Sequence, residues 1–457
     1  MDIDYSRSQV DLPAQPGPGA GVRPFPRTRS RFPEAGPGAG LSGRRWRRGA
    51  PSSDDLHVQI VSDPDALQRL ADAWWDLLTR SDADNVTLSP AWLLPWWRIF
   101  GDAGTRRLCV CLFWDGTTLV GLAPLLRRWR FAAPALPFAR IELLGTGEPE
   151  EDEIVSEYVG VIAARGQESI VAEALARVLV GHAEVGVAAR PADSPIGRWD
   201  EISLSAMDGG SPLPAYLRTA LEDRGLAVEL TTTSVAPHIP LPESFNAYLA
   251  ALSSSNRYFA RRSLREFDAY AGGKARFHRA EEKADLPRAT EVLISLHAQR
   301  WRAAGRLGAF ASRRFEAFHR AVMPALLSRG ALELRWVTVA DRPVAALYNL
   351  VSRGRVQSYQ GGRSLDAPAA ARVGIALHLH AIRAAIADGR REYDFLGGRS
   401  QYKRQLALAE RPLTRLVVER PGARRLAHSL TRRGFRWLRE RYEGAPAESP
   451  RSAHHSQ

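Results

Sequence analysis

The stretch "LELRWVTVADRPVAALYNLVSRGRVQSYQGG", residues 332–362, is the part of the chain that most clearly predicts its fold. Three runs rich in β-branched, aromatic and leucine residues are separated by two tight turns, around Asp341 and Gly354. Apolar runs separated by such short turns are typical of β-hairpins. The stretch therefore predicts three consecutive antiparallel strands.

Helical and strand patterns continue on both sides of this stretch. In the second half they predict helices at 243–252, 254–271, 285–304, 312–329 and 373–388, and strands at 275–280 and 391–396. In the first half they predict helices at 63–80, 90–100, 166–181 and 213–224, a hairpin turning at Asp115–Gly116, and strands at 140–145, 154–162 and 197–204. Mixed helices and strands in two similar series predict an α/β (α+β) fold.

A faint internal repeat links the two series. "FWDGTTLVGLAPL" (113–125) and "VTVADRPVAALYNL" (337–350) are both a strand, a two-residue turn and a second strand that begins with small residues. The polar, proline-containing segment 231–242 is the expected boundary between two duplicated domains. The predicted organisation is a tail at 1–52, domains at 53–235 and 236–419, and a basic C-terminal segment at 420–457.

The net charge of +13 over 457 residues is concentrated at the ends of the chain. Residues 1–50 and 411–457 carry +12 of it, so the body between them is nearly neutral. The first fifty residues are rich in Pro, Gly and Arg and lack hydrophobic periodicity, which predicts disorder. "RRLAHSLTRRGFRWLRERY" near the other end is typical of a basic amphipathic helix that contacts the body or an anionic membrane surface.

The sequence also excludes several classes of protein. It has no apolar signal region, no run of about eighteen apolar residues, no Walker loop, no HExxH and no G-x-S-x-G. We expect no metal: His378 and His380 lie two apart on one helix and cannot share an ion. Cys109 and Cys111 are expected to be buried thiols in a reducing cytoplasm.

The loop and helix at 366–389 are a candidate phosphate site. A helix N-terminus presents unpaired N–H groups and a partial positive charge. Gly374 and Ala376 would let a pyrophosphate approach the backbone closely. The alternative is a small-residue loop that only caps a packed helix, and the residues alone do not decide between the two.

From about Leu252 onward the order of these signals resembles the GNAT acyltransferase superfamily. It is similar in particular to the acetyltransferases of cellulose biosynthesis, the CelD/BcsL family, which are relatives of FemAB-type aminoacyltransferases. The segments that carry the resemblance are "SSNRYFARRSLREFDAYAG" (254–272), "LHAQRWRAAGRLGAF" (296–310), "YQGG" (359–362), "GIALHLHAIRAAIADGRREYDFLGG" (374–398) and "YK" (402–403). In the first half, "LSPAWLLPWWRIFG" and "DGTTLVGLAPL" match the same family.

This resemblance implies two GNAT-like domains and an acyl-CoA co-substrate whose pyrophosphate lies at the helix start near Arg372, Gly374 and Ala376. The usual superfamily pattern there is Gln/Arg-x-x-Gly-x-Gly/Ala, and Ala371 stands where its Gln or Arg would be. Backbone N–H groups of Tyr359, Gln360 and Gly361 are expected to hold the donor. The departure at Ala371 leaves open an aminoacyl-tRNA donor, as in the FemAB-like relatives.

The candidate catalytic residues lie in "YDFLGGRSQYK" (393–403). An amine that attacks a thioester needs a base for its proton and an acid for the departing thiolate. Asp394 is the candidate base and Tyr402 the candidate acid, with a salt bridge and simple packing as their alternatives. Lys403 is one of only three lysines among 63 lysine and arginine residues, which suggests that a compact point charge is needed there.

An acceptor site is predicted from a basic helix. Arg257, Arg261 and Arg265 lie at spacings of four, on one face of helix 254–271, and Trp301 lies in the family-like segment "LHAQRW". These four residues are candidates for binding an anionic acceptor, such as one linked to a sugar or nucleotide. A solvated helix face paired with Glu266 and Asp268 is the alternative for the arginines.

The sequence as a whole predicts a cytoplasmic acyltransferase of the GNAT type. The acceptor is an amine or hydroxyl compound, which the resemblance places in envelope or exopolysaccharide metabolism. A FemAB-like aminoacyltransferase acting on a peptidoglycan precursor is one rival, and a non-catalytic module that binds anionic polymers through its arginine-rich tails is another. No specific nucleic-acid partner is expected.

Overall fold

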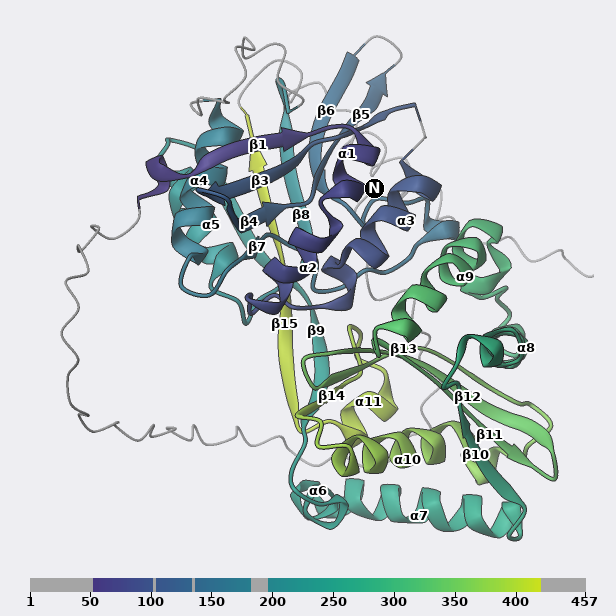
Figure 1. Cartoon of the computed structure of the whole chain (residues 1–457). Coiled ribbons are helices and arrows are strands. Elements are labelled where there is room, and N and C mark those ends of the chain that lie inside the picture. Colours follow the sequence, from purple (N-terminus) through teal and green to yellow (C-terminus); the bar gives the residue numbers. More distant parts are fainter. Residues whose placement is uncertain (1–51, 102–103, 134–135, 182–195, 421–457) are drawn as a thin grey trace, which may run out of the picture.

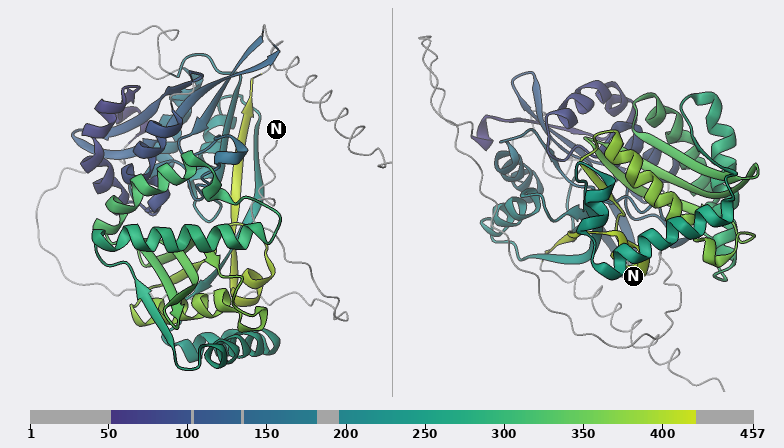
Figure 2. Two further views of the ribbon diagram at one scale, coloured as in Figure 1. Left: turned by 90° about the vertical axis from the view of Figure 1, so that its right-hand side faces the viewer. Right: turned by 90° about the horizontal axis from the view of Figure 1, so that it is seen from below.

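The computed structural model describes residues 52–101, 104–133, 136–181 and 196–420 (Figure 1). The predicted N-terminal tail, apart from Ser52, and the predicted basic C-terminal helix lie outside these residues. The described chain forms an upper and a lower half, each a mixed layer of strands covered by helices (Figures 1 and 2).

Strands of both halves belong to one mixed sheet. Its order is β10 (Ala275–Arg279), β11 (Leu332–Val339), β12 (Arg342–Ser352), β13 (Arg355–Arg363), β14 (Glu392–Asp394), β9 (Val228–Pro240), β15 (Ala409–Glu419), β8 (Glu201–Asp208), β6 (Leu136–Leu143), β5 (Leu125–Ala133) and β2 (Arg106–Leu108). A second sheet in the upper half has the order β1 (His57–Val61), β3 (Val110–Asp115), β4 (Thr118–Ala123) and β7 (Ile162–Ala163).

Eleven α-helices lie within the described residues. They are α1 (Pro64–Arg69), α2 (Ala71–Thr79), α3 (Pro90–Phe100), α4 (Glu168–Val180), α5 (Leu213–Glu222), α6 (Phe245–Ala251), α7 (Ser254–Ala271), α8 (Leu286–Arg302), α9 (Arg313–Ser328), α10 (Val373–Ala387) and α11 (Gln401–Leu406). Short 3-10 turns lie at Ser53–Asp55, Val86–Leu88, Glu150–Asp152, Lys283–Asp285, Ala309–Ala311 and Ala369–Ala371.

The three strands predicted at 332–362 are confirmed as β11, β12 and β13. Both turns between them place two residues at positive φ: Ala340 and Asp341 at 48° and 65°, and Arg353 and Gly354 at 43° and 75°. Two successive positive φ angles match the right-handed twist of a hairpin. The hairpin of β3 and β4 in the upper half is confirmed as well, with Asp115 paired to Thr118.

Two long strands, β9 and β15, join the halves, and β9 contains most of the segment expected at the domain boundary. β9 runs without a break through residues 231–240 and pairs with β15 over nearly its whole length. Toward one end β9 also pairs with β14, and β15 pairs with β8 of the upper half. The polar and proline-containing segment is therefore a central strand that both halves share, and β15 is a strand that the sequence analysis missed.

Two further expectations differ from the structure. The helix expected at 63–80 is broken at Leu70 into α1 and α2. The strand expected at 154–162 is mainly a loop, in which Val155 and Tyr158 have positive φ angles of 52° and 58°. Non-glycine residues adopt such angles only where surrounding contacts impose them. Here the contacts come from both halves: Thr87 and Trp92 of the upper half donate hydrogen bonds to this loop, and the loop also bonds Tyr359 and Asp394 of the lower half.

The loop before β7 packs against the lower half through polar and aromatic contacts. The Ser312 hydroxyl donates a hydrogen bond to Asp152 Oδ1 at 2.6 Å, and the Tyr359 hydroxyl donates one to the Ile154 carbonyl. The Trp92 ring lies 4.9 Å from that of Phe318 and 5.6 Å from that of Tyr359, between centroids. These side chains belong to one continuous core, so the halves are fixed relative to each other.

Helices cover both faces of the lower sheet (Figure 2). On one face α10 packs against β12 and β13, and α7 packs on α10. By length and composition alone the segment Ala369–Ala387 could cross a membrane, but here it is a core helix between the sheet and α7. On the other face α8 packs against β12 and β13.

The close packing of α8 on β13 depends on Gly362. A Cβ atom at this position would lie 2.3 Å from the backbone nitrogen of His297 and 2.5 Å from the carbonyl carbon of Leu296. Backbone atoms inside a packed helix cannot move aside cheaply. Gly362→Ala is therefore expected to lower the free energy of unfolding by about 1–3 kcal/mol or more, measured by urea denaturation. Gly374→Ala is the control, because a Cβ there meets nothing within 4 Å; equal losses in the two variants would contradict this account.

Candidate active site

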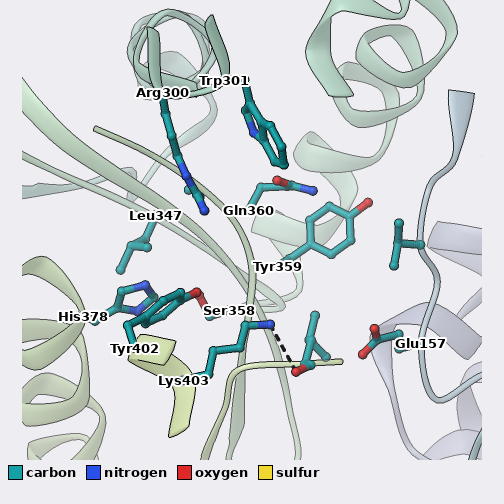
Figure 3. A pocket seen from close by; sticks show the side chains of 13 residues that line it. Glu157, Arg300, Trp301, Leu347, Ser358, Tyr359, Gln360, His378, Tyr402 and Lys403 are labelled. Carbon is teal, nitrogen blue, oxygen red and sulfur yellow. Dashed lines mark hydrogen bonds between the residues drawn. The ribbon is translucent and has the colours of Figure 1, made fainter. Parts of the chain in front are cut away.

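The candidate site lies where two parallel strands separate. β13 and β14 pair over only three residues, from Arg355↔Glu392 to Gln357↔Asp394. Beyond that point β14 ends, whereas β13 stays paired with β12 as far as Ala345↔Arg363. The edge of β13 from Ser358 onward therefore loses its strand neighbour on one side. A pocket opens at this edge (Figure 3).

The pocket is assembled from both halves of the molecule. β13 contributes Ser358, Tyr359, Gln360 and Gly361, and the segment after β14 contributes Leu396, Tyr402 and Lys403. The remaining lining residues are Arg300 and Trp301 of α8, Leu347 of β12, His378 of α10, and Val155 and Glu157 of the upper half. Six residues predicted from the sequence thus meet here: Trp301, Tyr359, Gln360, Gly361, Tyr402 and Lys403.

A β-bulge interrupts β13 at the pocket. The pairing with β12 passes from Asn349↔Ser358 to Tyr348↔Gln360, so Tyr359 is an extra residue without a cross-strand partner. The extra residue of a bulge is left out of the ladder and its backbone is redirected. The bulge lies where Tyr359, Gln360 and Gly361 line the pocket, and their binding of a donor through backbone N–H groups stays a prediction.

Lys403 lies in the first turn of α11 and is almost fully buried, with 2% of its surface exposed. Its Nζ donates hydrogen bonds to the carbonyl oxygens of Gly397, at 2.6 Å, and Leu396, at 3.3 Å. Two of the three N–H donors of the ammonium group are therefore used. Burial lowers the pKa of Lys403 to about 8, against the opposing effect of the Glu157 and Asp394 carboxylates.

Glu157 reaches the same pocket from the upper half, and the sequence analysis did not predict it. Its Oε2 accepts a hydrogen bond from the Gly397 N–H at 2.6 Å, and its other oxygen has no hydrogen-bond donor among the described residues. Burial raises the pKa of Glu157 to about 7, although the charge of Lys403 and the Gly397 N–H act in the opposite direction. Glu157 could have been recognised in the sequence as a charged residue within a largely apolar segment, the same pattern that pointed to Asp394.

Glu157 and Lys403 face each other without touching. Among the ion pairs of the described residues none joins these two side chains within 4.0 Å, although each shifts the pKa of the other. Both bond the turn around Gly397, whose neighbour Leu396 has a positive φ of 59°. A carboxylate and an ammonium are thus held apart at the two sides of one small pocket.

Asp394 does not line the pocket, which corrects its expected role as the base. Its side chain is fully buried. It accepts hydrogen bonds from the Tyr158 hydroxyl and the Leu396 N–H, both at 2.7 Å, and forms an ion pair with Arg411 at 3.3 Å. Burial raises the pKa of Asp394, opposed by Arg355 and these hydrogen bonds. The alternative of a salt bridge with a neighbouring arginine is the one observed, and Asp394 orders the turn that carries the pocket.

Tyr402 and His378 form one wall of the pocket. Their rings stack with centroids 5.3 Å apart, and His378 Nδ1 lies 3.0 Å from the Tyr393 hydroxyl. Burial raises the pKa of Tyr402, which keeps its hydroxyl protonated and able to donate a hydrogen bond. Burial lowers the pKa of His378 to about 3, so its imidazole is neutral. His378 was expected to be structural, but it lines the pocket.

The predicted phosphate site at the start of α10 is only partly available. Gly374 is open, since a Cβ there would meet nothing within 4 Å. Arg372 is not free for a ligand: its guanidinium pairs with Glu266 at 3.1 Å and lies over the Phe259 ring. Ala376 is fully buried in the core, which corrects its expected contact with a donor. None of the three residues lines the pocket.

The arginine stripe on α7 also lies away from the pocket, on the far side of α10 (Figures 1 and 2). Arg257 donates hydrogen bonds to the carbonyl oxygens of Ala250 and Leu252, so it caps α6. Arg261 and Arg265 are exposed on the outer surface. The expectation that these three residues bind an acceptor beside the donor is therefore corrected, and of the predicted acceptor residues only Trp301 reaches the pocket.

The lower half thus has two parallel strands that part around a pocket, next to a bulged strand and an apolar helix. Residues 254–404, which include most of the pocket, match the family model described as an acetyltransferase (GNAT) domain. The chain therefore carries a GNAT-type acetyltransferase domain. The fold class expected from the sequence, a mixed α/β protein with GNAT-like domains, is confirmed.

Several solved structures show a distant likeness to the chain. The crystal structure of FemX is 11% identical, with 75% of this chain and 95% of that chain covered and a TM-score of 0.49. L-PGS from Bacillus licheniformis is 9% identical, with 81% and 96% covered and a TM-score of 0.43. A tandem GNAT protein from the clavulanic acid biosynthesis pathway is 11% identical, with 80% and 99% covered and a TM-score of 0.37. No curated protein matches the sequence significantly.

Proposed function

We propose that the protein transfers an acyl group from acyl-CoA to an amine or hydroxyl of an acceptor bound in the pocket between β13 and α11. The observation that carries this proposal is the placement of Glu157 and Lys403 on opposite sides of the pocket beside the bulge of β13. A carboxyl group with a pKa near neutrality is suited to accept and release a proton at physiological pH.

In the proposed reaction each pocket group has one role. Glu157 accepts a proton from the acceptor ammonium or hydroxyl, whose nitrogen or oxygen then forms a bond to the carbonyl carbon of the thioester. Backbone N–H groups at the bulge near Tyr359 stabilise the oxyanion, and the C–S bond breaks. The Tyr402 hydroxyl donates a hydrogen bond, and then its proton, to the departing thiolate; it regains a proton from the newly bonded nitrogen of an amine acceptor, or from solvent when the acceptor is a hydroxyl. Lys403 fixes the turn around Gly397 and keeps a positive charge beside the developing negative charge.

The open helix start at Gly374 supports a place for the donor's pyrophosphate. Gly374→Glu adds a negative charge and a side chain there without meeting other atoms of the fold. The affinity for CoA is expected to fall at least tenfold, about 1.4 kcal/mol, with an unchanged melting temperature, measured by calorimetry and thermal unfolding. Gly374→Ala is the control. Equal CoA affinity in the Gly374→Glu variant and the parent protein would show that the donor does not bind at the start of this helix.

Aminoacyl transfer is the second candidate, because Arg372 is engaged by Glu266 and is not free for the phosphates of CoA. The same base and bulge would serve an aminoacyl ester as well as a thioester. The two donors are separated by one assay in which the purified protein receives acetyl-CoA, longer acyl-CoAs or aminoacyl-tRNA with a panel of amines. Release of free thiol from a CoA donor supports the main proposal, and transfer from tRNA alone supports the second.

The acceptor's metabolic role belongs to the proposal and rests on the resemblance to the CelD/BcsL family. We infer an acceptor of envelope or exopolysaccharide synthesis and a cytoplasmic reaction. This choice is tested by assaying acyl transfer to amino sugars, both free and linked to a nucleoside diphosphate. Transfer to simple amines but to no sugar derivative would separate the reaction from polysaccharide synthesis.

A further inference from the structure

Arg300 projects from the end of α8 into the pocket, toward Tyr402 and His378 (Figure 3). Burial lowers the pKa of His378 and the charge of Arg300 adds to this effect, whereas burial raises the pKa of Tyr402 and the charge of Arg300 opposes the rise. The neighbouring Trp301 is held in place by a hydrogen bond from its indole N–H to His297 Nε2 at 2.8 Å. Arg300 is therefore presented to the pocket by a fixed helix end.

Arg300 has no ion-pair partner among the described residues, unlike three other partly buried arginines. Arg355 pairs with Glu392 at 2.9 Å, Arg372 with Glu266 at 3.1 Å, and Arg411 with Glu392 at 2.8 Å. Arg300 forms no hydrogen bond or ion pair with any residue that the structure describes, and has only the face of Trp301, 5.5 Å from ring centroid to guanidinium carbon. A cation withdrawn from water is normally compensated by a carboxylate or another acceptor.

The surroundings of Arg300 add positive charge. Arg363 of β13 also lacks an ion pair among the described residues, and its pKa is lowered by burial and then by the charge of Arg300. Lys403 lies in the wall of the same pocket. The one carboxylate that lines the pocket, Glu157, comes from the upper half, on the opposite side from Arg300 in Figure 3. The Arg300 side of the pocket thus has cations that repel one another and no anion of its own.

We propose that Arg300, with Arg363 behind it, binds an anionic group of a substrate, a phosphate or a carboxylate, in this pocket. The planar guanidinium fork matches the oxygen pairs of both groups. The inference deepens the proposed function and rests on it for placing substrates here. With this proposal the pocket has two chemically distinct sides. Arg300 binds the anionic group of a substrate, and Glu157 lies beside the amine or hydroxyl that reacts.

The anion can come from either substrate, and equilibrium binding separates the two sources. Calorimetry on the full chain would compare the parent protein, Arg300→Ala and Arg302→Ala. Arg302 is the matched control because it is exposed on the same helix, two residues away. The probes are CoA, pantetheine (which lacks the phosphates of CoA), uridine diphosphate and inorganic pyrophosphate. Thermal unfolding shows whether each variant folds; Arg300→Ala loses no ion pair, only the contact with the Trp301 ring, so it should still fold.

Arg300→Ala is expected to weaken at least one phosphate-bearing probe about tenfold or more, whereas Arg302→Ala leaves all affinities unchanged. Weaker CoA binding with unchanged pantetheine binding assigns the anion to the donor. Weaker uridine diphosphate binding with unchanged CoA binding assigns it to the acceptor. Equal affinity of Arg300→Ala and parent protein for every anionic probe, including equally undetectable binding, overturns the proposal. Because no probe needs turnover, failure of acyl transfer with Arg300-dependent anion binding would refute the proposed reaction and leave this site standing.

Discussion

Glu157→Gln is expected to reduce turnover by about 10²- to 10⁴-fold, the range that a positioned general base contributes. The amide keeps the shape of the side chain and can still accept the hydrogen bond from the Gly397 N–H through its oxygen. It cannot take a proton from the acceptor. The loss should appear in kcat, with little change in the affinity for the donor, in a single assay of thiol release at saturating acyl-CoA.

Glu151→Gln is the matched control for this variant. Glu151 lies on the same acidic loop, but its side chain is exposed and does not line the pocket. Its turnover should equal that of the parent protein. A Glu157→Gln variant that folds and turns over at the parent rate would show that another group is the base.

The pH dependence of kcat/KM follows from the same pair of groups. Activity should rise with pH through about 7, because Glu157 must lose its proton to act as a base. It should fall again above about 8 as Lys403 loses its positive charge. The two values belong to the coupled pair, which titrates as a unit. A profile that is flat between pH 6 and pH 9 would contradict the assignment.

Lys403→Met is expected to lower turnover at least tenfold and to change the shape of this profile. Loss of the ammonium removes the fall in activity above about pH 8. It also removes the charge that lowers the pKa of Glu157, so the rise in activity should move to a pH above 7. Replacing a residue that only supports packing would shift neither the rise nor the fall of activity with pH. Methionine fills a similar volume but leaves the carbonyl oxygens of Leu396 and Gly397 without their donor, so the melting temperature should fall while the pH profile reports the role in catalysis.

Arg404→Met is the control for Lys403, because Arg404 is the exposed neighbour on α11. Lys403→Arg completes the series: it keeps the charge but must place a larger planar group against the carbonyl oxygens of Leu396 and Gly397. We expect its turnover to fall at least tenfold as well. Parent turnover in both Lys403 variants would mean that a lysine at this position is accidental.

Local sequence patterns predicted most of the lower half correctly. The turns at Asp341 and Gly354, the helix that ends before Gly389 and the strands beside them depend on residues close together in the chain. Such elements are encoded by side-chain periodicity and turn chemistry. The same reasoning misread residues 231–242 because proline and threonine there read as a boundary, whereas pairing with β15, more than 150 residues later, makes them a strand.

Within the site, the local sequence already places Tyr402 and Lys403 after a strand and a glycine-containing turn, and two adjacent glycines near the end of β13. Only the tertiary structure decided which groups meet at that turn. Glu157 lies 240 residues before Gly397, in a loop with positive φ angles at Val155 and Tyr158 that is held by hydrogen bonds to both halves. Arg257 and Arg300 both lie on predicted helices, and the packing of those helices directs the first to the end of α6 and the second into the pocket. The reason is physical: periodicity states which face of an element is apolar, whereas the neighbour of a charged side chain is fixed by how separate elements pack.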